Sequence, residues 1–240
     1  MGAIAEAMSA LGVDQPELRA KSRRSAQAIA EAVLPSSMVV WRGPEARQHQ
    51  APRPGRVALT FDDGPTPLTL DYLAVLEKLG ARATFFVIGE LCARYPELVA
   101  AIAEGGHELA SHGYTHRRFT ALSASELSDE LTRTQALLEP HSPPNRRPFV
   151  RPPHGAVSLR SILTCARRGF TTVLWSFNSN DWCNKDAAQV EGAFKTNRAA
   201  AGEIVLLHEG QSWTMNALPA IVGSLENMGH ELCTVRELLG

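Results

Sequence analysis

From residue 57 onward, short apolar runs alternate with longer stretches whose apolar residues recur every three or four positions. Short apolar runs bounded by Gly, Pro or Asn are typical of buried strands, and the longer periodicity is typical of amphipathic helices. The strands that this pattern predicts are 57–61, 83–88, 107–110, 148–151, 171–175, 203–208 and 231–235. The helices that it predicts between them are 69–79, 93–104, 123–139, 158–168, 186–200 and 214–228.

The alternation of strands with helices predicts an α/β fold with a parallel sheet. Closure into a seven-stranded (β/α) barrel buries every strand, although an open doubly wound sheet follows the same alternation. Residues 1–34 are rich in Ala, which predicts one or two amphipathic helices, and residues 42–56 have the composition of a linker. We therefore expect an N-terminal helical extension with its linker over residues 1–50 and one domain over residues 51–240.

Composition supports a large core and narrows the range of partners. The chain has 240 residues, of which 44% are hydrophobic and 20% charged, and its formal net charge of -1 predicts no nucleic-acid partner. No apolar stretch approaches the ~18 residues of a membrane span. The N-terminus has no basic segment before Glu6, so we expect a cytoplasmic location unless a leader has been removed. The composition does not say whether the chain is a monomer or an oligomer.

Four cysteines are present, and none of them belongs to a CxxC pair. This spacing argues against a cysteine zinc site, and a chain of this size does not depend on a disulfide framework. We therefore expect Cys92, Cys165, Cys183 and Cys233 to be reduced and mostly structural.

Reactive side chains follow five of the predicted strands, always at the carboxyl end. In an α/β barrel these ends converge on one face, where active sites lie, whereas chance would scatter such residues over both ends. The residues are Asp62 and Asp63 after strand 57–61, His112 and His116 after 107–110, Arg151 at the end of 148–151, Asn178, Asp181 and Trp182 after 171–175, and His208 at the end of 203–208.

Three of these side chains suit a catalytic metal ion. Asp63, His112 and His116 offer one oxygen and two nitrogen ligands and leave a coordination position open, as catalytic zinc sites do. Two histidines four residues apart are common without a metal, but the adjacent aspartates favour the metal site. Zinc is the default ion, and the same ligands accept other divalent first-row metals such as cobalt.

Asp62 and His208 are the candidates for proton transfer. Two adjacent carboxylates at a strand end are expected to point in different directions, so that Asp63 binds the ion while Asp62 acts as general base, with Arg151 orienting it. The alternative for Asp62 is a turn-capping role before Gly64. His208 is expected to act as general acid, and the alternative is an ordinary core histidine.

These residues lie in segments that resemble the five ordered motifs of the polysaccharide deacetylases, which form carbohydrate esterase family 4. This family includes deacetylases of chitin, chitooligosaccharides and peptidoglycan and some acetylxylan esterases, and the resemblance covers about residues 56–238. The segments are TFDDGP at 60–65, SHGYTH at 111–116, RPPHG at 151–155, NSNDW at 178–182 and LH at 207–208. The resemblance implies a deformed (β/α)7 barrel, which agrees with the strand count, and a catalytic domain over residues 51–240.

The resemblance also implies roles for single residues. Asp62 corresponds to the base, Asp63, His112 and His116 to the metal ligands, Arg151 to the residue that orients the base, and His208 to the acid. Asp181 is matched within the fourth motif as a catalytic residue. His154, Trp182 and Leu206 are implied to contact the substrate, and the backbone N–H of His154 would help to hold the oxyanion.

Two positions depart from the family pattern. His154 replaces a frequent Tyr. Asn178 stands where an Asp is expected to hydrogen-bond the catalytic histidine, and an amide there would supply no charge to raise the pKa of that imidazole. We therefore expect an acid-shifted rate profile for this chain.

The function that follows is metal-dependent removal of acetyl groups from N-acetylated sugars of a polysaccharide, an oligosaccharide or its precursor. One alternative is an amide hydrolase for cyclic ureides or imides on the same scaffold. Another is a non-catalytic metal-binding homologue, which Asn178 alone favours. The residues by themselves indicate a metal-dependent hydrolase and do not name the sugar.

Overall fold

The computed structural model describes residues 31–48 and 55–240. Within these residues, nine strands form one sheet in the order β1-β6-β5-β4-β3-β2-β8-β7, with β9 paired to β2. Every pairing between strands is parallel. The strands are β1 (Val39–Val40), β2 (Arg56–Gly64), β3 (Thr84–Val87), β4 (Glu108–Ser111), β5 (Phe149–Val150), β6 (Thr171–Val173), β7 (Phe177–Asn178), β8 (Ile204–His208) and β9 (Glu231–Cys233).

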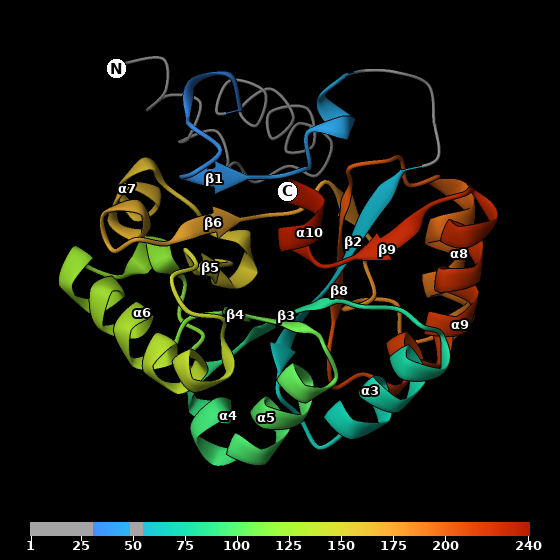
Figure 1. Cartoon of the computed structure of the whole chain (residues 1–240), viewed down its shortest axis with the longest axis horizontal. Coiled ribbons are helices and arrows are strands. Elements are labelled where there is room, and N and C mark those ends of the chain that lie inside the picture. Colours follow the sequence, from blue (N-terminus) through green and yellow to red (C-terminus); the bar gives the residue numbers. More distant parts are fainter. Residues whose placement is uncertain (1–30, 49–54) are drawn as a thin grey trace.

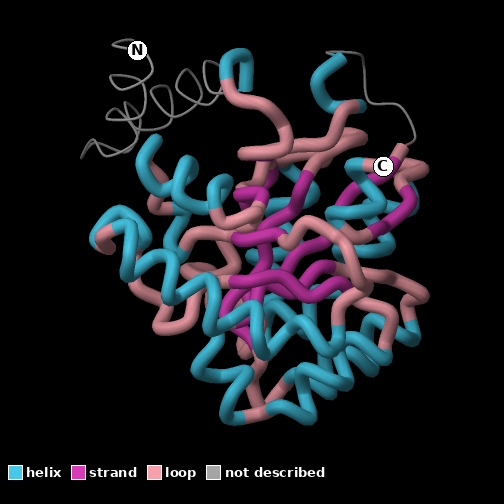
Figure 2. The backbone as a smooth tube through the Cα atoms, turned by 60° about the vertical axis from the view of Figure 1, so that its left-hand side comes forward, coloured by secondary structure: helices cyan, strands magenta, loops and turns pink. Residues whose placement is uncertain are grey.

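The sheet curls, and the helices surround it (Figures 1 and 2). The predicted deformed α/β barrel is therefore confirmed, and β1 and β7, the two ends of the strand order, are not paired with each other in the described part of the chain. The α-helices are α3 (Thr69–Lys78), α4 (Gly89–Arg94), α5 (Pro96–Glu104), α6 (Ala124–Leu138), α7 (Leu159–Arg167), α8 (Ala187–Thr196), α9 (Ser212–Asn227) and α10 (Val235–Leu239). Short 3-10 helices are η2 (Glu45–Gln48), η3 (Phe119–Ala121), η4 (Glu139–His141) and η5 (Pro153–Gly155).

Local sequence explains several helix boundaries. Ser123 begins α6 with a capping box, because its hydroxyl accepts from the backbone N–H of Glu126 while the Glu126 carboxylate accepts from the backbone N–H of Ser123. The predicted helix 93–104 is in fact two helices, α4 and α5, which meet at Tyr95. Pro96 causes this break, since proline lacks the N–H that a continuous helix needs but is favoured at the first helical position.

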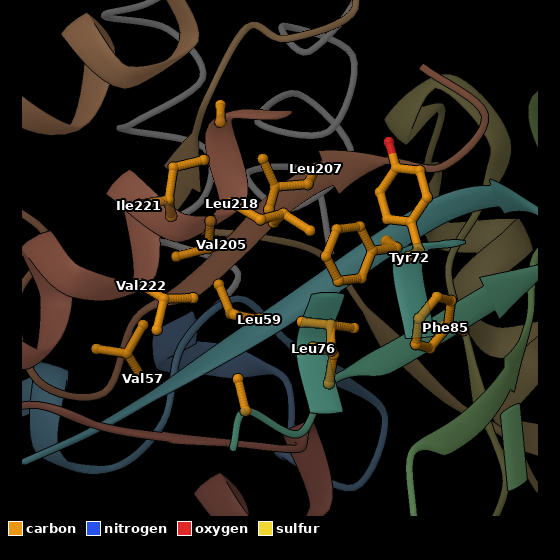
Figure 3. Packing of buried hydrophobic residues seen from close by; sticks show 14 of the residues in the cluster. Val57, Leu59, Tyr72, Leu76, Phe85, Val205, Leu207, Leu218, Ile221 and Val222 are labelled. Carbon is orange, nitrogen blue, oxygen red and sulfur yellow. The ribbon is translucent and has the colours of Figure 1, made fainter. Parts of the chain in front are cut away.

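Strand β2 separates two apolar layers by simple alternation. Val57, Leu59 and Phe61 belong to the large outer cluster, which includes residues of α3, α9 and β8 (Figure 3). The residues between them face the barrel interior, where Ala58 packs and where Thr60 and Asp62 are buried. Removing a fully buried side chain such as Leu76 would cost about 2–5 kcal/mol. This apolar layer fixes β2 and therefore the carboxyl end of β2, where the reactive residues begin.

Part of the predicted extension joins the sheet. Val39 and Val40 form β1 and pair with Thr172 and Val173 of β6, while Trp41 packs in a buried cluster with Leu174. The helices predicted within residues 1–34 fall almost wholly outside the described residues, as does the central part of the predicted linker. The boundary near residue 50 stays a prediction.

Two expectations from composition can be compared with the described residues. The four cysteines are free thiols, and three of them are buried. Across residues 31–48 and 55–240, no helix combines the length and the apolar character needed to cross a membrane.

Candidate active site

The end of β2 carries two adjacent aspartates on a β-bulge. Asp62 pairs with Phe86 of β3 and Gly64 pairs with Val87, so Asp63 is an extra residue without a register partner. Its φ of 74° lies in the left-handed region, which is uncommon for a residue other than glycine. Bulges re-aim side chains, and this one brings both carboxylates toward the same imidazole. The expectation that the two carboxylates point apart is therefore wrong, because it assumed uninterrupted strand alternation.

Asp63 and two histidines form a compact cluster. The Nε2 atom of His116 lies 3.0 Å from Oδ1 of Asp63, and the Nε2 atom of His112 lies 3.4 Å from the same oxygen. The ligand atoms of these three residues all lie within 4.8 Å of one another. Among the described residues, they form a group of His and Asp side chains that could hold a metal ion. The donor set fits zinc or a similar divalent ion, with a position left open.

Hydrogen bonding prepares His112 to bind through Nε2. Its Nδ1 donates to the backbone carbonyl of Arg151 at 2.8 Å, which orients the ring so that Nε2 faces Asp63 and is the nitrogen that could bind a metal ion. Burial opposes the charge of Asp63, but hydrogen bonds and positive charge from His112 and His116 outweigh it and hold the pKa of Asp63 well below its ordinary value. Asp63 is therefore ionised and available as a ligand at neutral pH.

Arg151 is completely buried and orients Asp62. One terminal nitrogen of its guanidinium donates to Oδ1 of Asp62 at 2.7 Å and to the hydroxyl of Thr60 at 2.7 Å. The remaining nitrogens donate to the carbonyls of Val173 and Leu174, so strands β2 and β6 are tied through this one side chain. Because Arg151 uses Oδ1, the other carboxylate oxygen of Asp62 stays on the side of His112, whose Nε2 lies 3.8 Å away.

His208 ends β8 beside Asp62, with which it is in register. Its Nδ1 donates to Oδ1 of Asp181 at 2.8 Å, and its backbone N–H donates to Oδ2 of Asp181 at 2.7 Å. Burial lowers the pKa of His208, but the hydrogen bond and the charge of Asp181, with smaller contributions from Asp62 and Asp63, raise it above its ordinary value. The Nε2 atom of His208 is thus left to donate a proton.

The expected role of Asn178 is wrong. Asn178 is exposed, and its side-chain oxygen accepts from the backbone N–H of Asn180 at 3.1 Å. The partner of His208 is Asp181, which is fully buried and also accepts from the hydroxyls of Ser179 and Thr214. Asp181 therefore supplies the negative charge that was expected to be missing beside His208. The expected acid shift of the rate profile has no basis.

Ser179 and Thr214 are supporting residues that the sequence alone did not identify. Both are buried hydroxyl residues, and both donate to the carboxylate of Asp181 at 2.9 Å. Trp213 adds a hydrogen bond from its ring N–H to the Asp181 carbonyl at 2.9 Å. Ser179 lies within the fourth motif and Thr214 lies six residues after His208, but these positions alone do not distinguish a supporting hydroxyl from any other loop residue.

The three residues implied to contact substrate differ in their settings. His154 is exposed, has a left-handed φ of 59°, and its ring centroid lies 4.8 Å from that of His116. Trp182 is 58% exposed and directly follows Asp181, so its ring is available for stacking. Leu206 is buried in β8, where it pairs in register with Thr60 and Asn178. Contact of these residues with a substrate stays a prediction.

The sequence and the fold of this chain are both similar to those of known proteins. The sequence profile of the family described as polysaccharide deacetylase matches residues 49–173. A peptidoglycan-N-acetylglucosamine deacetylase of Bacillus cereus is 33% identical over 212 residues, which are 85% of this chain and 94% of the relative. A solved family 4 carbohydrate esterase from Streptomyces lividans, in complex with acetate, is similar with a TM-score of 0.69 and 34% identity, covering 77% of this chain and 93% of that chain.

Another relative is longer than this chain. The peptidoglycan-N-acetylglucosamine deacetylase PgdA of Listeria monocytogenes is 31% identical over 233 residues, which are 95% of this chain and 47% of the relative. The chain therefore spans about half the length of that relative.

Proposed function

The chain belongs to the polysaccharide deacetylase family, and we propose that it is a metal-dependent hydrolase that removes acetyl groups from N-acetylated sugars of a polysaccharide, an oligosaccharide or its precursor. The observation that carries the proposal is the convergence of three groups at the carboxyl ends of β2, β4 and β8. These groups are the cluster of Asp63, His112 and His116, the carboxylate of Asp62, and the imidazole of His208.

In this proposal Asp63, His112 and His116 hold the metal, with zinc as the first candidate and cobalt as an alternative. When bound, the ion would polarise the acetyl carbonyl and lower the pKa of a water molecule. Asp62 accepts the proton of the attacking water through the oxygen that Arg151 does not use. The backbone N–H of His154 helps to hold the oxyanion that develops on the former carbonyl oxygen.

His208 completes the reaction. Its Nε2 proton passes to the sugar nitrogen as the C–N bond breaks, so that water and the N-acetyl group become acetate and a free amine. Asp181 keeps the imidazole oriented and raises its pKa, which favours the protonated form. Trp182 supports the proposal of a sugar substrate, because the face of a pyranose packs well on an exposed indole ring.

The test is acetate release from chitooligosaccharides, peptidoglycan fragments and acetylated xylan. Protein would be stripped of metal with a chelator, assayed, and assayed again after zinc or cobalt is restored. The proposal expects acetate only with metal, and almost none from Asp62→Asn. Absence of acetate from every substrate, with metal bound, would overturn the deacetylase proposal, and a cyclic ureide in the same panel would then test the alternative hydrolase.

A further inference from the structure

Two buried glutamates outside the five motifs contact the turns that carry the metal-binding side chains. Glu130 lies on α6 and is 6% exposed, and Glu209 follows His208 and is 4% exposed. Buried carboxylates are costly unless they are well hydrogen-bonded, so their presence calls for a physical reason.

Glu130 holds the turn between the two histidines. Its Oε2 accepts from the backbone N–H of Tyr114 at 2.6 Å and of Thr115 at 2.8 Å, and its Oε1 accepts from the hydroxyl of Thr115 at 2.5 Å. All three donors lie between His112 and His116. A single side chain from a distant helix therefore fixes the backbone that separates the two imidazoles.

Glu209 holds the turn that follows Asp63. Its backbone N–H donates to the carbonyl of Asp62 at 2.8 Å. Its Oε1 accepts from the backbone N–H of Thr66 at 3.0 Å, from the Thr66 hydroxyl at 3.1 Å, and from the hydroxyl of Thr69. The carboxylate packs against Gly64 so closely that a Cβ there would lie 1.9 Å from Oε2. The glycine of the first motif thus leaves room for Glu209.

The turns that Glu130 and Glu209 hold adjoin the two candidate metal ligands that have unfavourable backbone conformations. Asp63 and His116 have φ values of 74° and 59°, in the left-handed region that is unfavourable for a residue other than glycine. Such conformations persist where the surroundings determine them. Hydrogen bonds from these turns to the buried carboxyl groups of Glu130 and Glu209 provide that determination on both turns.

Building on the proposed function, we propose that Glu130 and Glu209 are positioning residues, each of which holds one turn of the metal site so that Asp63, His112 and His116 converge before the ion binds. Neither glutamate belongs to the cluster that would hold the ion. Each acts by limiting the backbone freedom of a ligand, which makes the metal affinity depend on residues of a distant helix and of the β8 end.

The experiment measures zinc affinity by competition with a chromophoric chelator, together with the visible absorption of the cobalt form. The variants are Glu130→Ala, Glu130→Gln, Glu209→Ala and Glu209→Gln. Glu130→Gln retains an oxygen for the two N–H donors and an amide that can donate to the Thr115 hydroxyl, so it should bind metal better than Glu130→Ala. Asp129→Asn and Glu226→Gln are matched controls, because these carboxylates are exposed on α6 and α9.

We expect the folded Ala variants to bind zinc about 10-fold or more weakly, with an altered cobalt spectrum, while the controls match the wild type. Circular dichroism of the metal-free proteins confirms folding. Wild-type affinity and an unchanged spectrum in folded Ala variants would overturn the inference. If the Ala variants do not fold, the zinc affinity and the cobalt spectrum of the Gln variants and of Thr115→Val test the inference in the same way. A wild-type chain whose metal binding is absent, or is unaffected by His116→Ala, would instead refute the metal site of the proposed function.

Discussion

The ion pair of Arg151 and Asp62 gives the sharpest prediction about stability. Arg151→Met keeps most of the aliphatic volume of the side chain and removes every donor of the guanidinium. Asp62 then stays buried without its partner, and the carbonyls of Val173 and Leu174 lose their donors as well. The perturbation therefore breaks a buried charge pair and the link between β2 and β6.

The magnitude follows from the burial of both groups. The side chains of Arg151 and Asp62 are 0% and 5% exposed, so water cannot replace the lost contacts without opening the barrel. Removing one partner of a buried ion pair typically costs about 3–5 kcal/mol, and each orphaned carbonyl adds to this loss. Since native domains are stable by only about 5–15 kcal/mol, the variant should be severely destabilised.

The assay is urea unfolding followed by tryptophan fluorescence and circular dichroism, with both signals required to coincide. Arg151→Met should lower the free energy of unfolding by at least about 3 kcal/mol. A double variant that adds Asp62→Asn removes both charges. Its loss in free energy of unfolding should be smaller than the sum of the two single losses by at least about 1 kcal/mol. Arg133→Met is the control, because the guanidinium of Arg133 lies over the ring of Tyr114, as that of Arg151 lies over the ring of Phe86, but Arg133 is exposed.

Two results would refute this reasoning. One is a loss below about 1 kcal/mol for Arg151→Met, since that would mean that the buried pair contributes no more than a surface pair. The other is strict additivity in the double variant, since that would mean that the two charges do not depend on each other. Arg133→Met should be much milder than Arg151→Met.

Three further predictions concern catalysis. Asp62→Asn should lower kcat/KM by about 10²–10⁴-fold while metal content is retained, and a parallel loss of metal would contradict its role as base. Asp181→Asn should move the alkaline limb of kcat/KM to lower pH, because the proton donor His208 loses the charge that raises its pKa, whereas Asn178→Asp should leave that limb in place. Trp182→Ala should raise KM for oligosaccharides several-fold with little change in kcat, and an unchanged KM would exclude a stacking role.

Periodicity was sufficient for most of the fold. The short apolar runs and the helical spacing between them predicted seven strands and their helices. Strands β1 and β7, of two residues each, were not predicted, because β1 lies between the predicted N-terminal helices and the linker and β7 closely follows the predicted strand 171–175. The break between α4 and α5 was missed because apolar spacing continues across Pro96, although the proline marked the boundary.

The site was predictable in its residue types and less so in its geometry. Parallel strands bring their carboxyl ends together, so the grouping of Asp63 with His112 and His116 followed from topology. The bulge at Asp63 could not be predicted, because it depends on the pairing of β2 with β3. The resemblance also implied position 178 as the partner of His208, but the chain turns at Asn180, whose φ is 55°, and buries Asp181 instead.

The central claim is that this cluster is a catalytic metal site for deacetylation. The most direct measurement is the rate of acetate release from an N-acetylated chitooligosaccharide as zinc is returned stepwise to metal-free protein. The account predicts a rate that rises from near zero and levels off when each chain holds a single ion, with no such rise in His116→Ala. Acetate release that does not depend on metal would contradict the account. So would a wild-type chain that binds zinc fully and releases no acetate.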